Sequence, residues 1–267
     1  MMLAIDIGNT TISCGLFRGG RLAQRFDVPT APAARAGTLK PRLEPRLRAR
    51  LPGARIEQTV LCSVVPRMSS VLVQALTSFK ISPIRVVGHD LTVPLKNRYK
   101  YPGQVGQDRL VGAYAAWQEF GRGGGEGGVG RGRDCIVADF GTAITIDVVT
   151  KDGSYLGGII APGLEISLEA LAARTALLPK VKLEEPPELL GRDTANSIRA
   201  GVLFGCAALC DGLVARLKRQ YASNALVVGT GGASRLVCKH TRQIDRLRPN
   251  LVLEGLYQLS LHPELYT

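Results

Sequence analysis

Short apolar runs, separated by glycine and polar residues, begin the chain and predict strands. Residues 3–7 form an apolar run typical of a buried strand, and residues 11–17 alternate apolar and polar positions as a second strand would. A turn at 18–20 leads to a third predicted strand at 21–28. The pattern therefore predicts a meander of three strands at the start of the chain.

Helical and strand patterns then alternate. Residues 35–51 predict a helix with breaks at its prolines, residues 58–66 a buried strand, and the stretch after Pro66 another helix. A strand is predicted at 84–88, and a loop over 97–109 follows it. The next helix has one apolar face, made of Leu110, Ala113, Tyr114 and Trp117.

The opening pattern returns in the second half of the chain. Residues 134–160 contain an apolar strand that ends in Asp139, a loop of small residues, an alternating strand, a turn and a third strand. The strand at 3–7 carries its own acid, Asp6, in the same place. The two acids are 133 positions apart, about half of the chain. This internal similarity predicts two copies of one α/β unit.

A glycine-rich segment, GRGGGEGGVGRGR at 121–133, separates the two copies. Its composition cannot hold a helix or a strand, so it predicts a flexible surface connection. Later, helices are predicted at 164–176 and 194–220, and a strand with a glycine turn over 224–234. The predicted organisation is an N-terminal domain at 1–120, the connection at 121–133 and a C-terminal domain at 134–267.

Composition agrees with an ordered α/β protein and limits its partners. The chain has 267 residues, of which 45% are hydrophobic, and a formal net charge of +12. Such a charge favours nucleotides or acidic small molecules. The chain has an Arg-rich stretch at 34–50 and an Arg-Gly stretch within 121–133. Nucleic-acid binding would also need aromatic platforms or a known binding module nearby, and the sequence offers neither. We therefore expect no nucleic-acid partner.

Cysteine usage points to a reducing compartment. None of the six cysteines is paired as C-x-x-C, and none of the three histidines stands beside a cysteine cluster, so a zinc site is not expected. The sequence shows no basic-then-apolar leader and no run of 18 uncharged apolar residues. We expect a cytoplasmic protein that does not enter a membrane.

The two acids sit where α/β proteins bind ligands. A carboxylate at the carboxyl end of such a strand faces the crevice, and the Gly-, Thr- and Asn-rich loops after Asp6 and Asp139 can approach phosphate oxygens. Carboxylates need a cation such as Mg²⁺ between them and a phosphate. A single D-x-G-x-T segment would be explained by a β-turn whose aspartate bonds to its own backbone. Two such copies and the late GTGG at 229–232 instead favour a nucleotide held between two lobes.

Several motifs resemble one protein family in order along the chain. DIGNTT, DFGTAITID and VVGTGG look like the phosphate-1, phosphate-2 and adenosine loops of the actin, sugar-kinase and heat-shock ATPase superfamily. YKYPGQVGQDRL, YLGGIIAPGLEISLEAL, GRDT and LVLEGL are more specific and resemble type III pantothenate kinases. The resemblance implies two duplicated ribonuclease-H-like domains, the actin-like ATPase fold, with a cleft between them.

The same resemblance implies an activity and its requirements. It implies a phosphotransferase with an alcohol acceptor, which uses ATP to phosphorylate the primary hydroxyl of pantothenate to 4'-phosphopantothenate, the first step of coenzyme A biosynthesis. It also implies Mg²⁺ with ATP, a monovalent cation (K⁺ or NH₄⁺), and a homodimer. One alternative is a non-catalytic regulatory member of the family, similar to transcription accessory factors. This chain keeps Asp6, Asp108 and Asp139 together with Arg109, which argues against that alternative.

The family roles transfer to this chain residue by residue. Asp108 of the G-x-D-R motif would be the proton acceptor, Asp139 would bind the monovalent cation, and Asp6 would face Mg-ATP. The residues implied to bind ATP are Asp6, Ile7, Gly8, Asn9, Thr10, Thr11, Ile12, Ser13 and Thr142. The residues implied to bind substrate are Tyr99, Gly106, Gln107, Asp108, Arg109 and Thr194.

Simpler interpretations exist for some of these residues. Without the family match, Asp108 would be an ordinary first-turn acid of a helix, Tyr99 a packing residue and Thr194 a helix cap. Gln107 departs from the small or apolar residue that the family motif usually has at this position.

Overall fold

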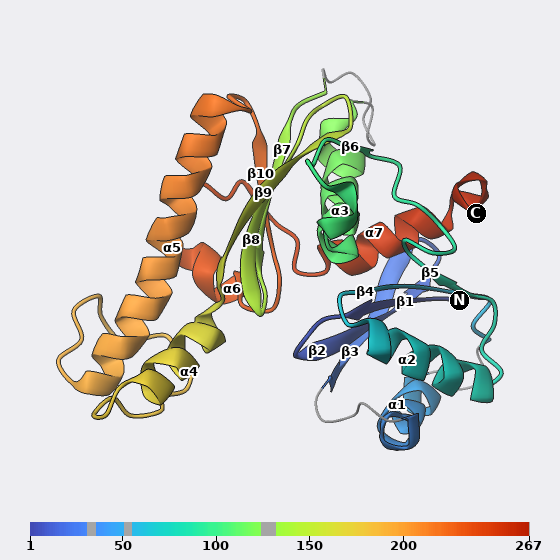
Figure 1. The fold of residues 1–267 in the computed structure, drawn as a ribbon, viewed down its shortest axis with the longest axis horizontal. Coiled ribbons are helices and arrows are strands. Elements are labelled where there is room, and N and C mark those ends of the chain that lie inside the picture. The colour runs from blue at the N-terminus through green and yellow to red at the C-terminus, as the bar shows by residue number, and fades with distance from the viewer. Residues whose placement is uncertain (31–35, 51–54, 124–131, 267) are drawn as a thin grey trace. The chain divides into compact units, whose positions relative to one another are not determined.

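The computed structural model describes residues 1–30, 36–50, 55–123 and 132–266 (Figure 1). Most of the predicted glycine-rich connection, residues 124–131, lies outside these ranges. The described chain forms two compact units. Unit 1 comprises Met1–Leu95, Tyr101–Ala115 and Val252–Thr267, and unit 2 comprises Lys96–Lys100 and Ala116–Leu251. The domain boundaries predicted from the duplicated motif stay a prediction.

The sheet of unit 1 has the order β3-β2-β1-β4-β5. β1, β2 and β3 form the predicted antiparallel meander, and β4 and β5 continue the sheet parallel to β1. The parallel strands place their carboxyl ends at the edge where β1 ends. The strands are β1 (Met2–Ile7), β2 (Thr11–Arg18), β3 (Arg21–Pro29), β4 (Gln58–Ser63) and β5 (Ile84–Val86).

The sheet of unit 2 repeats this topology. Its order is β11-β10-β7-β8-β9-β6, with β7, β8 and β9 antiparallel and with β10 and β11 parallel to β7. A short β6 is added beside β9. The predicted duplication of one α/β unit is therefore confirmed. The strands are β6 (Lys96–Asn97), β7 (Cys135–Phe140), β8 (Ala143–Val149), β9 (Ser154–Pro162), β10 (Leu226–Thr230) and β11 (Arg246–Leu247).

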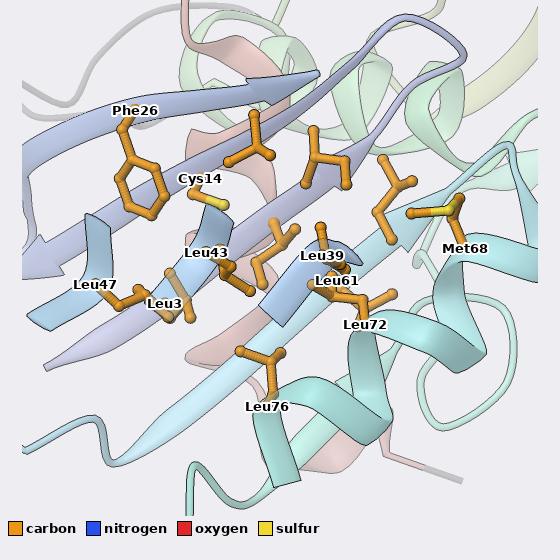
Figure 2. Close-up of a cluster of buried hydrophobic side chains, with 14 of the residues drawn as sticks. Leu3, Cys14, Phe26, Leu39, Leu43, Leu47, Leu61, Met68, Leu72 and Leu76 are labelled. Carbon is orange, nitrogen blue, oxygen red and sulfur yellow. The ribbon is translucent and has the colours of Figure 1, made fainter. Parts of the chain in front are cut away.

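Two helices, α1 (Ala36–Arg50) and α2 (Pro66–Ser78), cover one face of the unit 1 sheet (Figure 2). α1 continues through its two prolines, so the predicted break is wrong. Three leucines spaced four residues apart reach the core, and their burial offsets the backbone hydrogen bonds that the prolines cannot make. These leucines are Leu39, Leu43 and Leu47.

The other face of this sheet is covered by α7 (Leu251–Ser260), with α3 (Gln107–Ala116) packed on α7. The Tyr257 ring stacks on Phe17 of β2 with ring centroids 4.6 Å apart. A Cβ added to Gly255 of α7 would lie 2.8 Å from Cγ1 of Val111 in α3. Side chains alternate along a strand, so Asp6 shares this second face with Phe17 and not the face of Ile5 and Ile7.

In unit 2, α4 (Leu164–Arg174) and α5 (Thr194–Gln220) lie beside one another (Figure 1). Ile144, Ile146 and Val148, predicted to share one face of a strand, are buried together under α5. A short α6 (Ser234–Val237) completes this core.

In the described part of the chain, α5 is the one helix long and apolar enough to cross a membrane by length and composition. Its most apolar window has a mean hydropathy of 1.7, and 39% of that window is buried in the protein. Seven residues of α5 are buried, among them Leu203, Cys206 and Cys210 of the unit 2 core. We therefore interpret α5 as a core helix with one face uncovered in the monomer.

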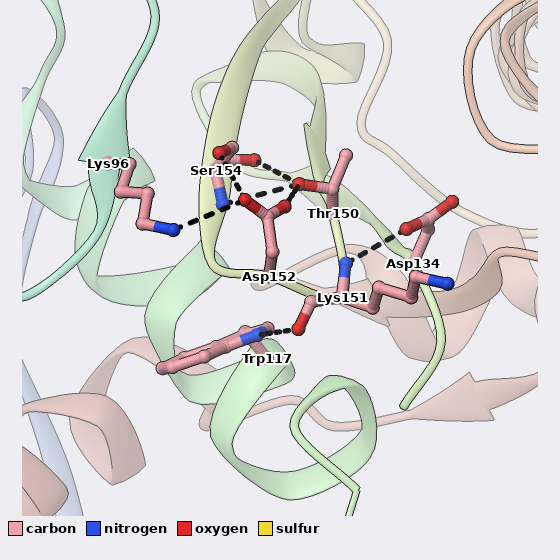
Figure 3. Close-up of polar contacts among 7 residues, drawn as sticks. All are labelled: Lys96, Trp117, Asp134, Thr150, Lys151, Asp152 and Ser154. Atoms are coloured by element: carbon pink, nitrogen blue, oxygen red, sulfur yellow. Dashed lines mark hydrogen bonds and ion pairs between the residues drawn. The ribbon is translucent and has the colours of Figure 1, made fainter. Parts of the chain in front are cut away.

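The predicted turn after β8 is fixed by a small polar network (Figure 3). The Asp152 carboxylate accepts hydrogen bonds from the hydroxyls of Thr150 and Ser154, with the Ser154 bond 2.9 Å long. These bonds, with the Thr150 bond the largest cause, lower the pKa of Asp152 to about 2. Trp117 anchors the same turn by donating from Nε1 to the Lys151 carbonyl at 3.0 Å.

Candidate active site

Asp6 lies near the carboxyl end of β1 and is partly buried. Its pKa is raised from 3.8 to about 7, mainly because burial disfavours the charged carboxylate, and secondly because of the negative charge of Asp108. A hydrogen bond from Cys62 acts in the opposite direction. Unit 1 therefore brings two of the predicted site acids close enough to influence each other.

The predicted ATP loop is a tight turn that β3 holds in place. The Gly8 amide donates to the Thr11 carbonyl at 3.0 Å and so closes the turn between β1 and β2. Thr30, which follows β3, donates from its hydroxyl to the Gly8 carbonyl at 2.8 Å and from its amide to the Thr10 carbonyl at 2.8 Å. Asn9 and Thr10 at the loop tip stay exposed. Hydrogen bonds from Thr30 thus fix the loop backbone, while the loop tip is accessible to a ligand.

Asp108 occupies the first turn of α3, as predicted. Its Oδ1 accepts a hydrogen bond from the Arg109 amide at 2.8 Å. A Cβ at Gly106 would stand 2.5 Å from the same oxygen, so only glycine leaves room for the carboxylate there. Packing against the Asp108 carboxylate therefore explains why the G-x-D-R motif has glycine two positions before the aspartate.

Gln107 has a specific neighbour in unit 1. Gly88, just after β5, has a φ of +84°, which favours glycine. The Gln107 side chain covers Gly88 so closely that an added Cβ would lie 2.9 Å from its Cδ. Gln107, the residue that departs from the family motif, therefore packs against the backbone of the turn after β5.

Asp139 ends β7 in unit 2 in the same way that Asp6 ends β1. Its strand neighbour in the parallel pairing with β10 is Thr230 of the GTGG loop. Gly231 has a φ of +93°, and a Cβ there would collide with Asp139 Oδ1 and the Phe140 backbone. A Cβ added at Gly163 would likewise collide with the Thr142 carbonyl. Unit 2 therefore packs the predicted phosphate-2 and adenosine loops directly against each other.

The two remaining predicted substrate residues also lie in unit 2. The Tyr99 ring packs on Gly157 of β9, where an added Cβ would lie 3.2 Å from Cδ2. Thr194 is the first residue of α5 and is exposed. The simpler interpretation of Thr194 as the cap is wrong, because Asp193 caps α5 by accepting from the Asn196 amide at 2.8 Å.

The structure adds three residues that sequence reasoning missed. Cys62 of β4 donates its thiol to Asp6, and Thr30 supports the ATP loop. Arg25 of β3 donates to the Ser13 hydroxyl at 3.4 Å, and its charge lowers the pKa of Asp6. Cys62 and Arg25 lie on strands and Thr30 directly follows one, each beside a predicted loop or acid. Locating them requires strand register, which no local motif encodes.

The donor set in unit 1 suits a hard divalent cation. Asp6 offers carboxylate oxygens, the kind of ligand that hard divalent cations prefer, and it lies near the predicted ATP loop. No group of three or more His, Cys, Asp or Glu that could hold a metal ion occurs within the described residues. Mg²⁺ commonly binds through one or two carboxylates together with waters and substrate phosphates, and Asp6 can supply one such carboxylate.

The duplicated sheets, in which the acids Asp6 and Asp139 lie near the carboxyl ends of β1 and β7, have the architecture of the actin-like class of proteins. Solved structures share the fold. A Baf family protein from Campylobacter jejuni, described as a transcriptional activator, aligns over 98% of this chain and 100% of its own with a TM-score of 0.58 and 18% identity. The activator of 2-hydroxyisocaproyl-CoA dehydratase from Clostridium difficile, with bound ADPNP, aligns over 98% and 96% with a TM-score of 0.51 and 11% identity.

Sequence comparison gives the particular family. The model of type III pantothenate kinase matches residues 2–216. Type III pantothenate kinase 1 of Symbiobacterium thermophilum is 38% identical over 97% of both chains. The enzyme of Desulfovibrio desulfuricans is 39% identical over 97% of this chain and 95% of its own. The chain belongs to the type III pantothenate kinase family, and it is a kinase.

Proposed function

We propose that the chain transfers the γ-phosphoryl group of ATP to the primary hydroxyl of pantothenate, giving 4'-phosphopantothenate and ADP in the first step of coenzyme A biosynthesis. The observation that carries this proposal is family membership over nearly the full chain, together with the acids and G-x-D-R motif of unit 1. The alternative of a non-catalytic regulatory member has no such support, because the likeness to the Campylobacter protein shows the fold alone.

Asp108 is the proposed proton acceptor. As the pantothenate hydroxyl oxygen bonds to the γ-phosphorus, the bond from that phosphorus to the β-phosphate oxygen breaks and the hydroxyl proton moves to Asp108. The carboxylate is held at the start of α3 by the Arg109 amide, which limits its rotation. The Arg109 guanidinium is the proposed partner of negative charge on the phosphoryl group or the substrate.

The turn from Asp6 to Ser13 is the proposed phosphate-1 loop, and Thr142 a second contact with ATP. Support comes from the exposed tip of this turn and from the backing hydrogen bonds of Thr30. Asp6 is the residue proposed to hold Mg²⁺ on the ATP side. When bound, Mg²⁺ neutralises charge on the transferring phosphates.

Asp139 is the proposed monovalent-cation ligand, for K⁺ or NH₄⁺. It is partly buried at the end of β7 and packed against Gly231. The proposed contacts of pantothenate are Tyr99, Gly106, Gln107, Asp108, Arg109 and Thr194. The proposed location is the cytoplasm, where a kinase of this family would meet ATP.

We expect purified wild-type protein to form phosphopantothenate from ATP and pantothenate, only with Mg²⁺ present, and faster with K⁺ than with Na⁺. In Asp139→Asn, the K⁺ concentration for half-maximal rate should rise about tenfold, because a neutral amide binds a cation more weakly than a carboxylate. The measurement is coupled ADP release with product identification by mass spectrometry. Absence of turnover in the wild type at saturating substrates would refute the kinase assignment for pantothenate. An unchanged K⁺ dependence in the variant would remove Asp139 from that role.

A homodimer is the proposed assembly, with unit 2 contributing the apolar surface. A groove of about 760 Å³ runs between α4 and α5 and is lined mostly by apolar side chains, with Thr194 among its lining residues. Large apolar side chains nearby in the sequence are strongly exposed, with Leu177 at 92% and Leu189 at 72%. A monomer rarely leaves such a surface in water, and a second copy of the chain would cover it.

The double variant Leu177→Glu with Leu189→Glu is expected to convert a dimer into a monomer, because two new charges would be buried at the interface. Light scattering after size-exclusion chromatography measures the mass. Leu261→Glu is the matched control, since this leucine is 58% exposed in unit 1 and should leave the mass unchanged. A wild-type protein that is monomeric at micromolar concentration would contradict the proposal.

A further inference from the structure

Cys62 is the direct neighbour of Asp6 in the sheet of unit 1. β1 and β4 are parallel, and their register pairs Asp6 with Cys62, so both side chains leave the same face near the carboxyl ends of their strands. The thiol sulfur lies 3.3 Å from Asp6 Oδ1 and donates to it. Cys62 has no exposed surface.

The thiol is held in its neutral form. Burial raises the pKa of Cys62 well above its ordinary value, and the negative charges of Asp6 and then Asp108 raise it further. A protonated thiol is a weak hydrogen-bond donor that carries no net charge. Even at its ordinary pKa a thiol is mostly protonated at neutral pH, so Cys62 is an uncharged donor beside Asp6.

A neutral donor suits a carboxylate that must bind a cation. A lysine or arginine at position 62 would fix Asp6 but would cancel the negative charge that attracts the metal. An aliphatic residue would leave one oxygen of a partly buried carboxylate without this partner. A thiol fixes Oδ1 and leaves the charge of Asp6 in place, as the outer partners of metal-binding carboxylates do elsewhere.

We propose that Cys62 is a positioning residue for the kinase reaction, holding the Asp6 carboxylate through its Sγ–H···Oδ1 hydrogen bond in the orientation that binds Mg-ATP. This inference rests on the proposed role of Asp6 in unit 1. It does not require the acceptor to be pantothenate.

The sheet supplies a matched comparison in Cys14. Cys14 is also fully buried, on β2, but it faces the apolar core under α1 and α2, beside Ile5 and Phe26. Truncating either cysteine removes the same atoms from the same sheet. A purely structural role predicts the same consequences for both, whereas a positioning role predicts a defect in Mg-ATP binding at Cys62 alone.

The test compares Cys62→Ala, Cys62→Ser and Cys14→Ala by calorimetric titration with Mg-ATP and by thermal melting. We expect Cys62→Ala to raise the Kd for Mg-ATP about tenfold, within the range typical of lost outer-shell partners. Cys62→Ser keeps a donor and should remain within about threefold of wild type, since a hydroxyl bonds a carboxylate at least as strongly. Cys14→Ala should lower the melting temperature without changing this Kd.

Equal Kd values in Cys62→Ala and wild type would overturn the proposal, as would a Cys62→Ser variant that folds but binds as weakly as Cys62→Ala. If Cys62→Ala does not fold, Cys62→Val, which fills the space without a donor, takes its place against Cys62→Ser. Binding of Mg-ATP is measured without an acceptor. A failure of pantothenate turnover in the wild type would therefore refute the proposed function and leave the test of Cys62 intact.

Discussion

Asp108→Asn is expected to lower kcat for phosphopantothenate formation by about 10²–10⁴-fold, the usual contribution of a positioned general base. Asparagine has nearly the same shape, and its side-chain oxygen can still accept the hydrogen bond from the Arg109 amide. The first turn of α3 should therefore keep its conformation. The amide cannot take the proton of the attacking hydroxyl, so the loss should appear in kcat more than in the KM for ATP.

The control for this variant is Glu57→Gln, which neutralises another acid of unit 1. Glu57 is 77% exposed and pairs with the amino terminus at 3.2 Å, at the opposite end of β1 from Asp6. It should leave kcat unchanged. Steady-state kinetics with thermal melting of each variant separates chemistry from folding. A folded Asp108→Asn enzyme with wild-type kcat would eliminate Asp108 as the base.

The second large effect is a pH-dependent gain in stability from Asp6→Asn in the absence of ligands. The folded-state pKa of Asp6 is about 7, above the ordinary 3.8. Folding therefore favours the protonated acid. The contribution of Asp6 to stability is full below pH 3.8 and is lost as the pH rises to 7, by at most about 4 kcal/mol. Asparagine avoids this loss, so the variant should melt several degrees above wild type at pH 8 and close to it at pH 4.

Thermal melts across that pH range test the prediction, and Mg-ATP supplies a second arm. Wild type should gain stability on adding Mg-ATP, whereas Asp6→Asn should gain little, because the proposed ligand of the metal has lost its charge. Glu57→Gln again serves as the control, because Glu57 is 77% exposed, and it should not raise the melting temperature at pH 8. A gain for Asp6→Asn that does not change with pH would show that burial of the Asp6 charge is not its cause.

Much of the fold could be predicted because it is encoded by local, repeated patterns. An acid near the end of a strand that leads into an antiparallel hairpin occurs at Asp6 and again at Asp139, and the two sheets have the same strand order apart from the added β6. The start of α3 at the G-x-D-R motif was equally local. Such features depend on side-chain period and turn residues, which a short window contains.

The missed features depend on contacts between distant segments. Cys62 meets Asp6 only because β4 pairs with β1 in one register, and parallel register is set by packing over the whole sheet. The continuous α1 depends on its leucines reaching a core built from four strands, so local proline rules gave the wrong result. Capping of α5 by Asp193, not Thr194, was a one-residue ambiguity that only backbone conformation resolves.

Unit 1 is built from three separate segments of the chain, and this affects the order in which its parts can fold during translation. The face of the first sheet that carries Asp6 is covered by α7, and α7 follows the unit 2 segment Ala116–Leu251 in the sequence. All of Ala116–Leu251 must emerge before α7 is available. The Asp6 face of the unit 1 sheet therefore stays uncovered during translation until α7 has been synthesised, which is after all of unit 2.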